Sequence, residues 1–130
     1  MKSIVEHVRI SSKGKEILKR LKSRTGIEHW NEICRIAYCY SLANPSPAMP
    51  TAAQDSAIDI EWKTFAGQYH LELTSITKYR ANKEGINIVN NEELSVFFRS
   101  HLERGISSIA GIKSLRQLVE IFMESNRKVQ

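Results

Sequence analysis

The hydrophobic positions of the first forty residues change from a period of two to a helical period, which predicts a strand and then two helices. Residues 4–10 alternate, with one face formed by Ile4, Val8 and Ile10 and the other by Val5, His7 and Arg9. Residues 13–24 have helical spacing, and Ser11-Ser12 before them supplies a hydroxyl for an N-cap. Thr25-Gly26 ends this helix, because glycine accepts a left-handed backbone. A second helix is predicted over residues 28–43.

A proline-rich loop follows this unit and precedes a helical part. Residues 44–56 contain all three prolines and almost no large apolar side chain, which is typical of a loop. Residues 58–65 fit a short strand or a helical turn. Helical spacing then predicts helices over 68–82, 92–104 and 114–125.

The same spacing predicts which side chains of the helical part are buried and which residues end its helices. The core side chains expected in the first of these helices are Tyr69, Leu71, Leu73, Ile76 and Tyr79. The stripe expected on the last helix is Leu115, Leu118, Val119 and Phe122. Asn91 is a candidate cap for the middle helix, and Gly105 is expected to break or kink it.

The predicted fold class is therefore mainly α. A short N-terminal strand plus a helix-turn-helix occupies residues 1–43, the proline-rich loop occupies 44–56, and a small bundle of helices occupies 57–130. We expect these parts to form one domain. The chain has 130 residues, of which 42% are hydrophobic and 25% charged, and this is the profile of a globular domain.

Several protein classes are excluded by the same sequence. No apolar run approaches the roughly 18 residues of a membrane span, and the N-terminus has no apolar core of a signal peptide. The two cysteines, Cys34 and Cys39, are too few for a disulfide scaffold. We therefore expect a cytoplasmic protein that does not enter a membrane.

Positive charge is concentrated at the N-terminus. Residues 1–24 carry eight Lys and Arg against two acids, whereas residues 25–130 carry eleven against twelve, so the net charge of +5 comes from the first segment. This asymmetry is typical of a protein that binds a polyanion such as DNA, although a solvated helix face has the same composition.

The basic residues of this segment are the candidate DNA-binding residues. The helix contributes Lys13, Lys15, Lys19, Arg20, Lys22 and Arg24, and the secondary candidates are Lys2 and Arg9. Successive helical residues turn by about 100°, so six side chains of one short helix cannot all face one duplex. Lys15, Lys19 and Lys22 share a face and are the strongest candidates.

Residues 4–43 resemble a ribbon-helix-helix unit. In that fold two chains pair their N-terminal strands, and the resulting ribbon enters the DNA major groove. The resemblance implies that Val5, His7 and Arg9 face outward, with Arg9 as the donor to guanine.

A wider set of motifs extends over residues 8–120. The blocks are Val8-Arg9-Ile10-Ser11, Thr25-Gly26-Ile27, Trp30-Asn31, Cys34-Arg35, Ser41-Leu42, Trp62-Lys63-Thr64-Phe65 with Gly67 and Tyr69, and His101-Leu102-Glu103-Arg104-Gly105-Ile106. In this order they resemble the DndE family, the small subunit of bacterial DNA phosphorothioation systems.

The DndE resemblance implies a subunit without catalytic chemistry or a cofactor of its own. Its partners would be a cysteine desulfurase, an iron–sulfur protein and an ATPase-like protein, which together replace a non-bridging phosphate oxygen by sulfur. The resemblance also implies binding of double-stranded DNA, with nicked duplex favoured, and a homotetramer. Tetramer packing would bury the N-terminal ribbon and leave the lysine-rich helices as the contact surface.

Two other functions fit parts of the sequence. A dimeric ribbon-helix-helix repressor would recognise a palindromic operator through His7 and Arg9. A protein–protein adaptor would have no DNA affinity, and its lysines would serve only solubility.

Enzyme chemistry has weak support. Glu61-Trp62-Lys63 matches half of a metal-dependent nuclease site, but Asp55 and Asp59 are too close in sequence to supply the acid from a separate strand. Cys34 and Cys39 lack the spacing of a redox pair, and the four histidines lack metal-ligand spacing. His101 and Arg104 either contact a phosphate or a subunit, or lie as favourable cations at a helix C-terminus, and we favour the second interpretation. The sequence predicts no enzyme, no metal and no cofactor.

Overall fold

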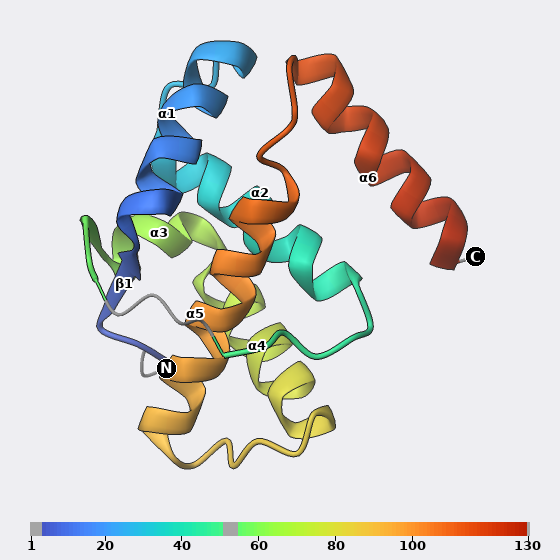
Figure 1. Cartoon of the computed structure of the whole chain (residues 1–130). Coiled ribbons are helices and arrows are strands. Elements are labelled where there is room, and N and C mark those ends of the chain that lie inside the picture. The colour runs from blue at the N-terminus through green and yellow to red at the C-terminus, as the bar shows by residue number, and fades with distance from the viewer. Residues whose placement is uncertain (1–3, 51–54, 130) are drawn as a thin grey trace.

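The computed structural model describes residues 4–50 and 55–129, in which a two-stranded sheet lies at one side of a group of helices (Figure 1). The elements in chain order are β1 (His7–Ile10), α1 (Ser12–Thr25), α2 (Trp30–Ala43), β2 (Ile58–Glu61), α3 (Trp62–Ala66), the 3-10 turn η1 (Gly67–Tyr69), α4 (His70–Lys83), α5 (Asn91–Ser108) and α6 (Leu115–Val129). The predicted fold class, mainly α with a short N-terminal strand, is confirmed.

The two strands pair within the chain. β1 runs antiparallel to β2, with Val8 opposite Ile60 and Arg9 opposite Asp59. Val8 and Ile10 are buried while Arg9 is exposed, as the alternation predicted. The prediction that Val5 faces outward was wrong, because regular strand begins only at His7 and Val5 joins the core instead.

Local signals set both ends of α1. The Ser11 hydroxyl accepts from the Gly14 N–H, and Gly26 at the other end has φ 78° while its N–H donates to the Lys22 carbonyl. The N-cap is also held from a distance, because the Ser11 N–H and hydroxyl donate to the buried carboxylate of Glu103 at 2.9 and 3.0 Å. Thus α5 fixes the start of the basic helix.

The crossing of α2 and α5 forms the centre of the fold (Figure 1). Gly105 does not break α5, which continues to Ser108. A Cβ at Gly105 would lie 1.9 Å from the Ala37 carbonyl oxygen, so the glycine is what lets the two helix backbones approach. Asn90, rather than Asn91, caps α5 by accepting from two amides of its first turn.

The buried face of α4 differs from the predicted one. Of the five expected core side chains only Leu73 is buried, and the four exposed ones are Tyr69, Leu71, Ile76 and Tyr79. The face that meets the core carries Thr74, Thr77 and Ala81 with Leu73. Apolar spacing misses this face because a threonine can be buried when its hydroxyl has a partner, and Thr77 Oγ1 lies 2.7 Å from the hydroxyl of buried Tyr38.

The last helix also buries less than predicted. Leu118 is buried, but Leu115 and Val119 are about half exposed. Phe122 is half-buried against the core, and its ring packs on Tyr40. α6 therefore rests on the body of the protein along only part of its apolar stripe.

Candidate nucleic-acid interface

The basic side chains of α1 are divided between the two flanks of the helix. With about 100° per residue, Lys15, Lys19 and Lys22 lie within about 60° of one another, and we call them the lysine row. Lys13, Arg20 and Arg24 lie within about 40° of one another on the other flank and are called the arginine row. The row centres are roughly 150° apart. The buried face of α1, which contains Ile17, Leu18 and Leu21, lies between them on the inner side.

The lysine row leaves its charges at the surface. Lys19 and Lys22 are exposed and Lys15 is half-buried. Lys19 Nζ lies 3.7 Å from a Glu16 carboxylate oxygen, and Lys22 Nζ lies 6.0 Å from the centre of the Trp30 ring. Ion pairs between exposed groups contribute little free energy, so all three ammonium groups can turn to a phosphate.

The arginine row reaches a part of the chain that sequence reasoning did not connect with it. The Arg24 guanidinium donates to the Ile112 carbonyl at 3.4 Å, in the connection between α5 and α6. Lys113 directly follows Ile112 in the chain and Arg116 lies in the first turn of α6, and both side chains are exposed. Nothing local in the sequence indicates this neighbourhood, because 88 residues separate the two contact partners.

The remaining candidates do not join α1. Lys2 lies outside the described residues. Arg9 is exposed, but its Nε lies 3.6 Å from Asp59, and His7 Nδ1 lies 2.7 Å from the same carboxylate. β2 fills one hydrogen-bonding edge of β1 from within the chain. A carboxylate between the two proposed base-contacting side chains repels DNA, so this face does not suit a DNA-reading ribbon.

The arginines near the end of α2 serve the fold. Arg104 donates to the Ser41 hydroxyl and carbonyl at 2.9 and 2.8 Å and to the Ser46 carbonyl at 2.8 Å. Arg80 donates to the Asn44 and Ser46 carbonyls at 2.6 and 3.1 Å. The interpretation that His101 and Arg104 lie at the C-terminus of their own helix was wrong, because α5 continues to Ser108. Arg104 and Arg80 instead donate to carbonyl groups at and just after the C-terminal end of α2.

His101 completes this network from inside. Its Nδ1 lies 2.8 Å from the Ser41 hydroxyl and its Nε2 lies 3.1 Å from the Glu84 carboxylate. Because Arg104 donates to the Ser41 oxygen, the Ser41 hydrogen is free to point at Nδ1, and Nε2–H faces Glu84. Burial lowers the pKa of His101, while the Glu84 carboxylate opposes that change. The donors of this cluster are already used by the protein, so it does not suit a phosphate.

The groups considered for catalysis have structural contacts. The Asp55 carboxylate accepts from the Ser12 N–H at 2.8 Å and from its hydroxyl at 2.6 Å, and these bonds lower the pKa of Asp55. Burial raises the pKa of the Cys34 thiol to about 12, which keeps it protonated and unreactive. Within residues 4–50 and 55–129, no three His, Cys, Asp or Glu side chains come together as a metal site. Among the described helices, none combines the length and apolar character of a bilayer span.

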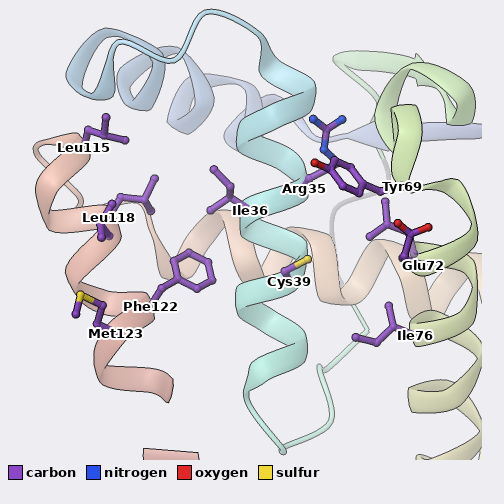
Figure 2. A pocket seen from close by; sticks show the side chains of 12 residues that line it. Arg35, Ile36, Cys39, Tyr69, Glu72, Ile76, Leu115, Leu118, Phe122 and Met123 are labelled. Carbon is purple, nitrogen blue, oxygen red and sulfur yellow. The ribbon is translucent and has the colours of Figure 1, made fainter. Parts of the chain in front are cut away.

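A groove of about 700 Å³ lies between α2, α4 and α6 (Figure 2). α6 directs Leu118 and Phe122 toward α2. The opposite wall contains Tyr69, from η1, and Ile76, from α4. The α6 side chains that line it and stay about half exposed are Leu115, Val119 and Met123. The lining of the groove is almost entirely apolar, which suits contact with another apolar surface.

Comparison with known proteins identifies one family. The family described as DNA sulphur modification protein DndE matches residues 7–117, so the match ends three residues into α6. A crystal structure of DndE from Escherichia coli B7A, described as involved in DNA phosphorothioation modification, superimposes with a TM-score of 0.68 at 20% identity. The superposition covers 83% of this chain and 99% of that chain, and at this identity it shows the fold alone. None of the curated proteins matches the sequence.

Proposed function

This chain belongs to the DndE family of DNA sulphur modification proteins, and on that premise we propose that it is a subunit that binds duplex DNA and catalyses no step itself. The lysine row carries this proposal. Three cationic side chains lie on one flank of α1, and both ends of this helix are capped. The caps fix the ends of the helix, so the three side chains keep the same position relative to the rest of the protein. The other subunits of the modification system would supply the sulfur chemistry.

The proposed mechanism is neutralisation of phosphate charge. Lys15 and Lys22 are separated by about 10 Å along the helix axis, comparable to three base-pair steps of one DNA strand at about 3.4 Å each. Each phosphate contact releases a condensed counterion, which makes binding weaker as salt rises and nearly independent of base sequence. No cofactor is needed for this mechanism.

Binding to nicked duplex follows if several copies act together. Three lysines form a modest patch, and an oligomer raises the effective concentration of the second and later patches. A nick makes the duplex easier to bend, so more than one lysine row can reach phosphates at once. We propose a homotetramer for this reason and because the family resemblance implies one.

The apolar groove is our proposed contact between copies. Its α6 wall exposes Leu115, Val119 and Met123, while its other wall exposes Tyr69 of η1 and Ile76 of α4. The groove and the exposed apolar side chains of α6 belong to the same chain. In a two-fold contact, each copy can therefore place its α6 in the groove of the other. Val119→Lys with Met123→Lys is expected to lower the mass measured by light scattering. An unchanged mass would exclude this contact.

The test of DNA binding is a fluorescence-anisotropy titration of intact and nicked duplexes of unrelated sequences across a salt series. Lys15→Ala, Lys19→Ala and Lys22→Ala together should weaken binding and reduce the salt slope by about 0.9 per lost phosphate contact. The matched control, Lys63→Ala, Lys78→Ala and Lys83→Ala, removes the same charge from α3 and α4. Equal affinities of the two folded variants would exclude the lysine row.

A protein–protein adaptor is the second candidate, favoured by the apolar groove. It predicts no DNA binding by the wild-type protein even at low salt. The repressor alternative has less support, because Asp59 lies beside both of its proposed base contacts. It predicts a preference for one sequence and a large loss of affinity on Arg9→Ala.

A further inference from the structure

The C-terminal end of α1 and the start of α6 form one basic surface. Both lie at the same end of the molecule (Figure 1), where Arg24 donates to the Ile112 carbonyl. The surface is made of Arg20, Arg24, Lys113 and Arg116, and we call it the junction surface. All four side chains are exposed. It joins the arginine row of α1 to residues about ninety positions later in the chain.

Few acids oppose these charges. Arg116 Nε lies 3.3 Å from a Glu120 carboxylate oxygen, but the two side chains are 90% and 58% exposed. A pair so exposed contributes little free energy, and a phosphate can replace Glu120 as the partner. Glu16, the nearest acid on α1, is within 3.7 Å of Lys19 on the lysine row. The junction surface therefore keeps a positive balance.

The lysine row and the junction surface face two directions from one helix. Their α1 side chains are roughly 150° apart around an axis, and a helix with its side chains is about 10–12 Å across. The major groove of B-DNA is about 12 Å wide and has one phosphate backbone on each side. The width of the helix thus matches the distance between two backbones of a duplex.

We propose that α1 lies along a major groove, with the lysine row on the phosphates of one strand and the junction surface on those of the other. This inference rests on the proposed function and adds the second strand to it. Between the two rows α1 exposes Ser12, Ser23 and Glu16, and Ser12 is already bonded to Asp55. The Glu16 carboxylate lies 3.7 Å from Lys19 Nζ of the lysine row. Apart from the two rows, α1 therefore offers the groove floor no cationic side chain that could read a base, in keeping with binding that depends little on sequence.

Only a duplex offers two phosphate backbones, so the test compares binding to duplex DNA with binding to single-stranded DNA. The affinity of the full chain for a duplex and for one of its single strands is measured by anisotropy across a salt series. The variant is Arg20→Gln, Arg24→Gln and Lys113→Gln, and its control is Lys63→Gln, Lys78→Gln and Lys83→Gln, with the same change in net charge. We expect the variant to lower the duplex salt slope by about 2 to 3 and the ratio of duplex to single-strand affinity by at least about tenfold. Single-strand affinity should change by less than about threefold relative to the control.

A second variant tests the junction surface while leaving the Arg24–Ile112 contact in place. Lys113→Gln with Arg116→Gln changes only exposed side chains, and it should lower the duplex slope by about 1 to 2. Thermal melting followed by circular dichroism confirms that each variant is folded.

Other outcomes overturn specific statements. Duplex binding and slope equal to the control would refute a role for the junction surface, while the lysine-row variant, measured in parallel, would still test the proposed function. An equal loss on duplex and single strand would refute the two-strand arrangement. Absence of binding by the wild-type protein would refute the proposed function itself, and this inference with it.

Discussion

Gly105→Ala tests the close crossing of α2 and α5. In an exposed helix this change would stabilise the protein by about 1 kcal/mol, because alanine has the higher helix propensity. Here the added Cβ would lie 1.9 Å from the oxygen and 2.5 Å from the carbon of the Ala37 carbonyl. Carbonyl atoms of a packed helix cannot rotate away as a side chain can, so the two helices must separate by about 1.5 Å to reach ordinary contact.

The expected cost follows from that separation. A gap of about 0.5–1 Å already forfeits a quarter to a half of the dispersion attraction between two surfaces, and overpacked cores typically lose about 1–3 kcal/mol. α2 and α5 share the most extensive contact between helices in the described part of the chain. We therefore expect Gly105→Ala to lower the free energy of unfolding by about 3 kcal/mol or more despite its gain in propensity. In a domain of this size that corresponds to a Tm lower by about 10 °C.

The assay is thermal unfolding followed by circular dichroism, with a urea titration for the free energy. Gly111→Ala is the matched control, since a Cβ there has no heavy atom within 4 Å, and its stability should stay within about 0.5 kcal/mol of wild type. If Gly105→Ala melts within about 2 °C of Gly111→Ala, the two backbones are not in contact at this glycine and the reasoning is refuted.

Three further changes test polar and titratable groups of the interior. Glu103→Gln replaces one of the two oxygens that accept from Ser11 by an amide donor. A urea titration should show a free energy of unfolding lower by about 1–3 kcal/mol. An unchanged midpoint would show that Glu103 does not hold this N-cap. Burial lowers the pKa of His101, so below the ordinary histidine pKa of about 6.5 the unfolded chain binds more protons than the folded one. The stability of the wild-type protein should therefore fall as the pH drops from about 6.5 toward 5, and that of His101→Gln should fall less. Parallel profiles of Tm against pH for the two proteins would contradict this. Burial raises the pKa of Cys34 to about 12, whereas Cys39 is exposed. A disulfide reagent at about pH 8 should therefore label Cys39 in the native protein and Cys34 only in urea. Rapid labelling of both thiols in the native protein would contradict the burial of Cys34.

Local sequence signals were sufficient for α1 and its basic character. The Ser11 cap, the left-handed Gly26 and the apolar spacing between them act within a few residues, and the observed helix ends one residue beyond the predicted segment at each end. The charge asymmetry was likewise visible in composition. The sequence also indicated the family through motif blocks, and the match over residues 7–117 confirms it.

Tertiary contacts decided where those elements face and what they meet. Spacing predicted that Tyr79 is buried and that Gly105 interrupts a helix, yet Tyr79 is 67% exposed and Gly105 lies inside α5 against Ala37. The face of α4 that is buried instead contains Thr77, which meets Tyr38 of α2, and Gly105 meets Ala37 of the same helix. Both partners lie in a distant segment, and no periodicity of α4 or α5 contains that information. The same holds for the candidate interface. The lysine row is a property of one helix and could be predicted, whereas the junction surface exists because Arg24 meets Ile112 across 88 residues, and only packing of the chain brings charges so far apart together.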